Sequence, residues 1–210
     1  MATGTAQGMR FRVLGISGNL RKASFNSGLL RAAQTVAPTG VDISIFDIRE
    51  IPFYDVDVEA GRDPRPVVDL KDAIRQSDGL LFATPEYNWG TSGALKNAID
   101  WASRDKGKGS LMGKPATIVG AGGRPGTARA QVQLQQTLAE TGSLVLAKPG
   151  LLVAAFAPMK FDDNGHLVDD DTKRLRGSHL EEFTKWMVRL ASGGEFVRHA
   201  CEMDIQSAAD

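Results

Sequence analysis

The sequence of 210 residues contains one cysteine, Cys201, and three histidines. A single cysteine excludes an internal disulfide framework and a cysteine-rich zinc site. The histidines, at positions 166, 179 and 199, do not have the spacing of metal ligands. We therefore expect no metal centre. Because Cys201 is far in sequence from every motif described below, we also expect no catalytic thiol.

The sequence also lacks an excess of one charge and a long apolar run. It has 25 basic and 25 acidic residues, whereas a nucleic-acid-binding protein usually has a basic excess, so we expect no nucleic-acid partner. No run of about 18 or more apolar residues is present, so we expect no membrane partner. Residues 1–8 are small and polar and lack the apolar core of a signal peptide. We expect a disordered lead there and a cytoplasmic protein.

What the sequence does contain is a regular alternation of short apolar runs with helical patterns. Its apolar content of 42% and its charged content of 24% are typical of globular proteins. The patterns predict strands at 11–16, 41–46, 80–83, 116–119 and 143–147, and helices at 27–36, 67–76, 94–103, 127–140 and 171–190. Such alternation is typical of an α/β fold in which helices cover both faces of a parallel sheet.

The remaining segments are predicted to be loops, one uncertain strand and a tail. Residues 47–66 contain three prolines and no clear period, which predicts a long loop. The apolar run 151–156 is either an extension of the sheet or an edge strand. Ser192-Gly193-Gly194 should end the last helix. We therefore predict one domain over residues 9–194 and a weakly ordered tail over residues 195–210.

The loop after the first predicted strand is rich in hydrogen-bonding side chains and leads into a helix. It carries six candidate anion-binding residues: Ser17, Asn19, Arg21, Ser24, Asn26 and Ser27. The unpaired N–H groups and the dipole of a helix N-terminus favour an anion. The loop has neither the Walker A pattern nor G-x-G-x-x-G, and it has no cysteine. It is either a cradle for a phosphate that is not cleaved or an ordinary polar turn with an N-cap serine.

Two further loops suit a flat ring. The loop after the third strand offers Tyr87 and Trp89 as a stacking surface, with Pro85 and nearby glycines. The loop after the fourth strand, Gly120-Ala121-Gly122-Gly123, lets the backbone approach a ligand closely. In the flavodoxin-like strand order 2-1-3-4-5 the first, third and fourth strands are adjacent, so their loops meet at one edge. A phosphate at one end and a redox-active ring at the other indicate FMN.

Two stretches of the sequence resemble a known family. Gly18-Asn19-Leu20-Arg21-Lys22-Ala23-Ser24-Phe25-Asn26-Ser27 is one, and Thr84-Pro85-Glu86-Tyr87-Asn88 followed by Gly93-Ala94-Leu95-Lys96-Asn97-Ala98-Ile99-Asp100-Trp101 is the other. They are similar to the NADPH-dependent FMN reductase family, which includes chromate, quinone and azo-dye reductases. The resemblance covers roughly residues 10–190.

The resemblance implies a flavodoxin-like three-layer sandwich with a five-stranded parallel sheet, bound FMN, and a homodimer or homotetramer. By position, the phosphate would be held by Asn19, Arg21, Ser24, Asn26 and Ser27. The ring would lie along Pro85, Glu86, Tyr87 and Asn88, chiefly against backbone atoms. This chain departs from the family at Asn19, at Gly120 and Ala121, where serines are common, and at Ser92, where the family has proline. We expect these departures to affect the reduction potential of the flavin and the substrate preference of the protein.

The function that these expectations favour is an FMN-dependent oxidoreductase. NADPH or NADH would pass hydride to the flavin, and a small acceptor (a quinone, an azo compound, chromate or free flavin) would then be reduced. No side chain is expected to act as an obligatory catalytic acid or base. One alternative is a flavodoxin-like electron carrier without turnover of its own, although such carriers are usually acidic. Another is a nucleotide-binding protein without redox activity.

Four further residues are candidates for a structural or a functional role. Glu86 is a solvated charge or pairs across an interface between subunits. Trp101 belongs to the core or to a subunit interface. Arg124, next to the glycine-rich loop, is a candidate for attracting the phosphates of NADPH. His166 follows Asn164-Gly165 and is most simply a turn residue.

Overall fold

The computed structural model describes residues 10–104, 109–156 and 158–207, and for residues 194–207 it describes the backbone alone. Its centre is a parallel sheet with the strand order β2-β1-β3-β4-β5, and a sixth strand also pairs with β4. The strands are β1 Phe11–Ser17, β2 Val41–Phe46, β3 Gly79–Ala83, β4 Pro115–Gly122, β5 Leu144–Val145 and β6 Leu151–Ala154. The predicted flavodoxin-like order is confirmed.

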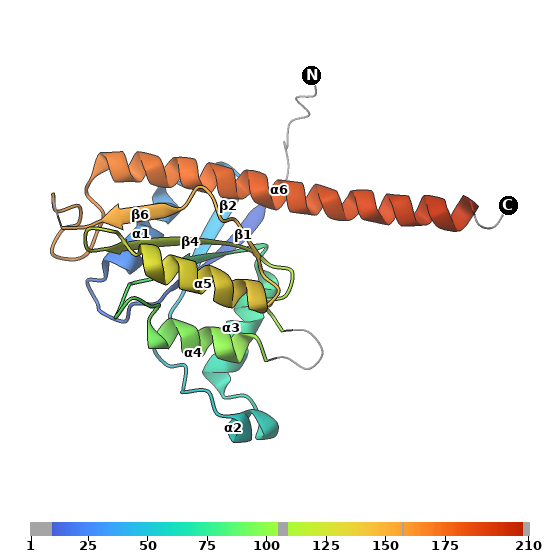
Figure 1. Ribbon diagram of the computed structural model, residues 1–210, viewed down its shortest axis with the longest axis horizontal. Helices are drawn as coiled ribbons and strands as arrows, with labels where there is room; N and C mark the ends of the chain where they lie inside the picture. The colour runs from blue at the N-terminus through green and yellow to red at the C-terminus, as the bar shows by residue number, and fades with distance from the viewer. Residues whose placement is uncertain (1–9, 105–108, 157, 208–210) are drawn as a thin grey trace.

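Helices cover both faces of this sheet, as Figure 1 shows. They are α1 Phe25–Thr35, α2 Val56–Gly61, α3 Arg65–Gln76, α4 Gly93–Ala102, α5 Ala128–Glu140 and α6 Asp170–Ser207. Helices α1 and α6 pack on one face, over a core that includes Val13, Leu81 and Val119. Helices α3, α4 and α5 pack on the other, over a core that includes Leu80 and Ile118. β1 and β3 are almost wholly apolar because both of their faces are covered.

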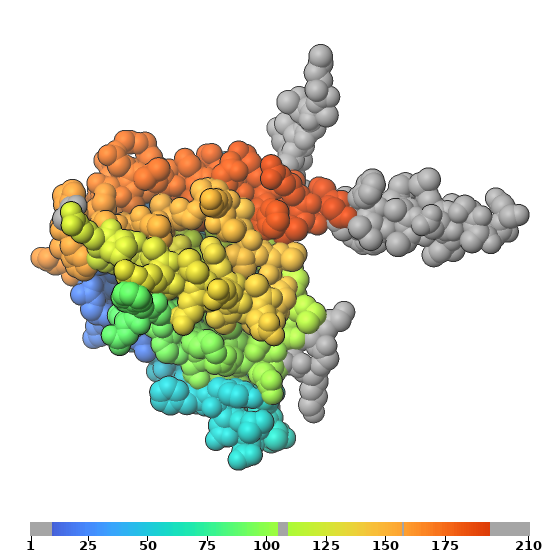
Figure 2. Space-filling view, in the orientation of Figure 1, coloured from blue at the N-terminus to red at the C-terminus, as the bar shows by residue number. Residues whose placement is uncertain are grey.

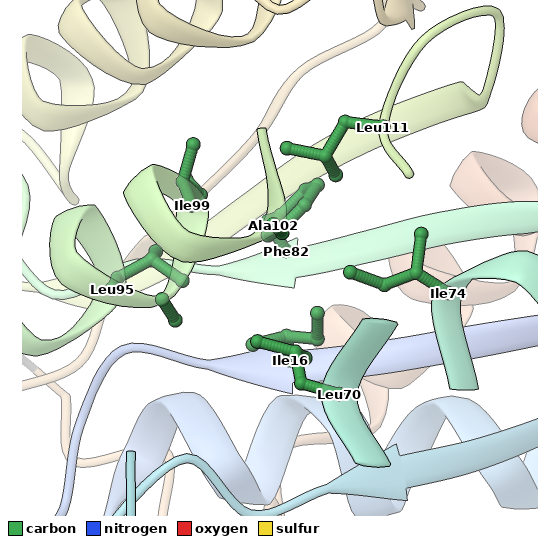
Figure 3. Close-up of a pocket in the computed structure, with 9 residues that line it drawn as sticks. Ile16, Leu70, Ile74, Phe82, Leu95, Ile99, Ala102 and Leu111 are labelled. Carbon is green, nitrogen blue, oxygen red and sulfur yellow. The ribbon is translucent and has the colours of Figure 1, made fainter. Parts of the chain in front are cut away.

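The core beneath α3 and α4 contains a small void of about 10 Å³. Figure 3 shows apolar side chains from these helices and from β1 and β3 converging on it, among them Leu70, Phe82 and Ile99. No polar side chain lines it. We therefore regard it as a packing defect in the core and not as a ligand site.

Two short strands share the fifth position of the sheet. β5 pairs with the start of β4, at Pro115 and Ala116, whereas β6 pairs with its end, from Val119 to Gly122. The predicted strand 143–147 is thus shorter than expected, and the apolar run 151–156 extends the sheet. Between them Pro149, which has no N–H to donate, is incompatible with a continuous ladder. As a result, β6 runs directly toward the loop that follows β4.

Three predicted boundaries were wrong. The fourth strand does not end at residue 119 but continues to Gly122, because its last residues pair with β6, so of the predicted loop 120–123 only Gly123 follows the strand. The expected loop 47–66 contains the short helix α2, whose N-cap Asp55 accepts a hydrogen bond from the Asp57 N–H (2.8 Å). Figure 2 shows this segment, in cyan, protruding from the body of the molecule. The last helix does not end at Ser192-Gly193-Gly194 but continues to Ser207. Glycine costs a helix about 1 kcal/mol relative to alanine, whereas proline, which breaks helices, is absent from this stretch.

The predicted lead 1–8 lies outside the described residues, and the domain limits 9–194 and 195–210 stay predictions. Within the described residues no helix is long and apolar enough to cross a membrane. The same residues contain no group of three or more histidine, cysteine, aspartate or glutamate side chains that could hold a metal ion.

Helix α6 buries the polar side chains of His179 and Arg176. His179 is 3% exposed, and its Nε2 lies 2.8 Å from Thr117 Oγ1 on β4. Arg176, one turn earlier, is fully buried, and its guanidinium nitrogens have no hydrogen-bond partner in the described chain. Burial, with a smaller contribution from the charge of Arg176, lowers the pKa of His179 to about 3.

Acid should therefore destabilise the protein through His179. An unfolded chain protonates histidine near pH 6.5, so between pH 6.5 and pH 3 the unfolded state binds the extra proton and stability falls with falling pH. The slope is about 1.4 kcal/mol per pH unit, or about 2 kcal/mol between pH 6.5 and pH 5. Urea unfolding of the wild type and of His179→Gln at both pH values measures it. An equal loss of stability in both proteins would contradict the prediction.

Candidate cofactor-binding site

A pocket of about 310 Å³ lies where the chain leaves β1, β3 and β4. This volume falls within the range of roughly 300–1,000 Å³ that is usual for small-molecule sites. The pocket is lined by Asn19, Arg21, Phe25, Asn26, Pro85, Glu86, Tyr87, Ala121, Gly122, Gly123 and Phe156. The three loops singled out in the sequence therefore meet at one site, as the strand order predicted.

The end of the pocket near α1 is formed by the hydroxyl-rich loop. Ser24 is the N-cap of α1, because its Oγ accepts a hydrogen bond from the Ser27 N–H (3.1 Å). Ser17 Oγ accepts hydrogen bonds from Ser27 Oγ (3.0 Å) and from the Asn19 N–H (3.3 Å). These three serines are not among the residues that line the pocket. Their hydroxyls hold the loop in shape, and the predicted N-cap serine is Ser24.

Arg21 supplies the positive charge at this end of the pocket. Its N–H donates to Asn19 Oδ1 (3.0 Å), which folds the loop back on itself. Its guanidinium carbon lies 4.9 Å from the centre of the Phe25 ring, at the first residue of α1. An exposed guanidinium and the N-terminus of a helix thus face the same space, an arrangement that favours an anion.

Asn26, the second residue of α1, joins the start of that helix to the end of β4. Its Nδ2 donates to the Ala121 carbonyl (3.1 Å), and its Oδ1 accepts from the Ala121 N–H (3.0 Å). The side chain is only 2% exposed, so both hydrogen bonds are shielded from water. Asn26 lines the pocket, and this pair of bonds sets the distance between two of its walls.

The first and second loops touch at Gly18 and Ser92. A Cβ on Gly18 would lie 2.7 Å from Ser92 Oγ and 3.0 Å from Pro85 Cδ, so only glycine fits there. Ser92 Oγ donates to the Gly18 carbonyl (2.6 Å) and accepts from the Leu95 N–H (3.2 Å) as the N-cap of α4. Ser92 therefore serves as a link between the two loops.

The glycines of the third loop differ in what they do. A Cβ on Gly120 would lie 1.8 Å from Thr127 Oγ1, so this residue permits close packing behind the loop and is not a lining residue. A Cβ on Gly122 would meet the Gly126 carbonyl at 2.6 Å. At Gly123 a Cβ would meet no atom within 4 Å, so the backbone borders open space. A ligand can therefore approach the main chain at Gly123.

The second loop turns at the pocket rim. Pro85, Glu86 and Tyr87 line the pocket, whereas Asn88 and Trp89, which the sequence placed at the ring, are not among its lining residues. The Glu86 carboxylate contacts the start of α5. Partial burial raises the pKa of Glu86, but hydrogen bonds from the N–H groups of Ala130 and Arg129 and from the Arg129 guanidinium outweigh burial, and the pKa is lowered. Glu86 therefore pairs within its own chain.

The sequence did not single out two aromatic residues that line the pocket. Phe25 stacks on Phe161, with ring centres 4.6 Å apart, and meets Phe156 edge to face at 5.6 Å. Phe25 is the first residue of α1, so its place next to the predicted loop was a usable signal. Phe156 follows β6, and only the pairing of β6 with the end of β4 brings it to the site.

The helix after the second loop holds the segment 52–54. Trp101 is fully buried, and its Nε1 donates to the Pro52 carbonyl (2.9 Å). Asn97 Nδ2 donates to the same carbonyl (2.8 Å), and its Oδ1 accepts from the Tyr54 N–H (2.7 Å). Trp101 is therefore a core residue of this chain.

Arg124 is exposed. His166 lies in a turn, where its Nδ1 is 3.0 Å from Asp162 Oδ2.

Comparison with known proteins identifies the family to which this chain belongs. A sequence model described as NADPH-dependent FMN reductase matches residues 11–157. The chain belongs to the NADPH-dependent FMN reductase family. The matched region contains all three loops and ends one residue beyond Phe156. Family membership and the flavodoxin-like order of the sheet agree with the expectation from the sequence.

Relatives and solved structures extend over most of the chain. An NAD(P)H-dependent FMN reductase of Pseudomonas aeruginosa is 46% identical over 180 residues, covering 85% of this chain and 96% of the relative. A probable NADPH:quinone oxidoreductase of Oryza sativa is 44% identical over 185 residues, covering 85% and 93%. The structure of FerB, a flavoenzyme NAD(P)H:(acceptor) oxidoreductase of Paracoccus denitrificans, aligns with a TM-score of 0.77 at 33% identity, covering 85% and 98%.

The residues of the pocket fit the cofactor of this family. One end has the Arg21 guanidinium and the N-terminus of α1, which suit a phosphate. The other end combines Pro85 and Tyr87 with the open backbone at Gly123, which suits the edge and face of a planar ring. The polar side chains that line the pocket are neutral or positively charged apart from Glu86, whose carboxylate is hydrogen-bonded to the start of α5.

Proposed function

We propose that this chain is an FMN-dependent oxidoreductase that accepts hydride from NADPH or NADH and reduces a small acceptor, with quinones as the best-supported class. The observation that carries the proposal is the pocket itself, in which an anion-binding end and a ring-binding end are built by three loops of one sheet edge. The quinone class is supported by the quinone oxidoreductase among the relatives. Bound FMN would supply the redox chemistry.

The residues of this chain would bind and orient the cofactor. Arg21, Asn19 and the start of α1 would hold the phosphate, with Asn26 and the serines 17, 24 and 27 keeping these groups in place. Pro85, Glu86 and Tyr87 would border the ring on one side and the segment 120–123 on the other, with Asn88 and Trp89 completing the second loop. No side chain is assigned the transfer of a proton.

The lining of the pocket also offers exposed aromatic surface to a second substrate. Phe156 is 57% exposed and Tyr87 is 51% exposed, so two aromatic side chains of the lining still face solvent. Exposed aromatic faces beside a ring-binding site suit a flat acceptor that stacks. A homodimer or homotetramer and a cytoplasmic location stay predictions from the sequence and the family.

The test is a rapid-mixing experiment with the purified, FMN-reconstituted protein. On mixing with NADPH or NADH under anaerobic conditions, the visible absorption of the bound flavin should bleach in a single turnover. Addition of a benzoquinone should then restore the colour. A protein that binds FMN but bleaches only with a partner reductase would be an electron carrier, and a protein that does not bind FMN would overturn the proposal.

A further inference from the structure

The second loop ends in a tight hairpin that protrudes from the pocket rim. Tyr87 and Gly90 exchange two backbone hydrogen bonds (2.9 and 3.0 Å). The two residues between them have left-handed backbones, with φ of 48° at Asn88 and 69° at Trp89. Two positive φ values in a row are typical of a type I′ turn. Asparagine tolerates this conformation, but a bulky residue such as tryptophan adopts it rarely, so surrounding contacts must hold it.

The first of these contacts is made by Glu86, the residue before the hairpin. Its Oε2 accepts hydrogen bonds from the N–H groups of Arg129 (2.9 Å) and Ala130 (3.2 Å), and its Oε1 accepts from the Arg129 guanidinium (3.0 Å). The N-cap residue of α5, Thr127, makes no capping bond with its side chain. Glu86 therefore performs the capping of α5 from another loop, and this ties the loop to the helix.

Arg129 makes the second contact at the hairpin tip. Its guanidinium carbon lies 4.3 Å from the centre of the Trp89 ring, which is close enough for a cation–π interaction. Arg129 therefore contacts both Glu86, which precedes the hairpin, and Trp89, which has a strained backbone within it. The Glu86 side chain is 12% exposed and that of Arg129 is 46% exposed, so the ion pair is partly shielded from water.

The far side of the hairpin rests on the same helix. Gln133 Oε1, one turn along α5 from Arg129, accepts a hydrogen bond from the Thr91 N–H (2.8 Å). A Cβ on Gly90 would lie 2.9 Å from that oxygen, so the fit between hairpin and helix is close. The hairpin is thus fastened to α5 at both of its ends, and Tyr87 is the part of it that lines the pocket.

We propose that Glu86 and Arg129 act together as positioning residues that fix the Tyr87–Gly90 hairpin as a wall of the cofactor pocket. This proposal rests on the proposed function only for the identity of the ligand, FMN. The fastening of the hairpin to α5 is a property of the chain without cofactor. The fastening also explains why a carboxylate can line a pocket for an anionic cofactor. The negative charge of Glu86 is paired with Arg129 and with the N–H groups at the start of α5.

The first test measures hydrogen exchange in the FMN-free protein. In Glu86→Gln and in Arg129→Met, backbone exchange in a peptide covering 86–91 should be about tenfold faster than in the wild type, whereas exchange in β3 should be unchanged. Arg129→Lys retains the charge toward Glu86 but lacks the planar group that stacks on Trp89, so it should give an intermediate rate. Arg189→Met, at an exposed arginine of α6, is the matched control and should have no effect.

The second test measures the dissociation constant for FMN in the same proteins and in the double variant. Each single variant should bind FMN about tenfold more weakly, and the double variant should be no weaker than the worse single variant, because both changes release the same hairpin. Additive losses, or weaker binding with unchanged exchange at 86–91, would overturn the proposal. If the wild type failed to bind FMN, the proposed function would fall, and the exchange experiment would still decide the role of this pair.

Discussion

Replacing Asn26 by leucine should lower the free energy of unfolding by about 2–6 kcal/mol. Leucine has a similar size but cannot pair with Ala121, so a buried N–H and a buried carbonyl lose their partners. Each unsatisfied buried group costs about 1–3 kcal/mol. The same change frees the end of β4 from the start of α1, so the dissociation constant for FMN should rise at least about tenfold. Urea unfolding and a fluorescence titration with FMN measure the two effects.

Two further variants make this result interpretable. Asn26→Asp keeps an acceptor for the Ala121 N–H but has no donor for the carbonyl, so its stability should lie between those of the wild type and the leucine variant. Asn164→Leu applies the same substitution in an exposed turn and should change stability by less than about 0.5 kcal/mol. Tight FMN binding by a destabilised Asn26→Leu would show that the link between α1 and β4 does not shape the pocket.

Replacing Arg176 by methionine should do the opposite and stabilise the protein. Burial without an acceptor lowers the pKa of Arg176 to about 9, which reflects the cost of keeping a charge in the core. Methionine has a similar length and no polar hydrogens, and exchanges of buried charges for apolar residues can add about 1–4 kcal/mol of stability. Unfolding by urea at pH 7 measures the gain, with Arg189→Met as the exposed control on the same helix.

The Arg176→Met variant carries a second, independent signal. The charge of Arg176 contributes to the low pKa of His179, so that pKa should rise in the variant. Nuclear magnetic resonance titration of the His179 ring would follow it. Lower stability of the variant at pH 7 would contradict the prediction.

The order of the sheet could be predicted from the sequence because it depends on local patterns. Short apolar runs that alternate with helical periods leave few topologies, and the loops after adjacent strands must then meet. The same logic brought Arg21, Tyr87 and Gly123 to one pocket. The sequence patterns could not distinguish residues that face a ligand from residues that shape a loop, such as Ser24 and Gly120. That distinction depends on which atoms surround each residue in the folded chain, as at Gly120, where a Cβ would lie 1.8 Å from Thr127 Oγ1.

The features that the sequence did not reveal depend on contacts between distant residues. Nothing near Glu86 indicates that its partner is Arg129, 43 positions away. Nothing within the run 151–156 indicates that it pairs with the end of β4 and delivers Phe156 to the pocket. The end of α6 was wrong for another reason, because two glycines weaken a helix without forbidding it.

The split fifth position of the sheet separates two tasks along the chain. The candidate phosphate-binding and ring-binding residues precede residue 124, whereas the stretch from β6 to the start of α6 places Phe156 at the pocket and packs Phe161 against Phe25. That stretch also supports the first loop from behind, because a Cβ on Gly165 would lie 2.7 Å from the Ala23 carbonyl and a Cβ on Gly28 would lie 2.0 Å from the Gly165 carbonyl oxygen. Diversification of what enters the enzyme, by natural drift or by a library of variants, should therefore concentrate at exposed positions such as Phe156 and Met159 and spare buried ones such as Phe161.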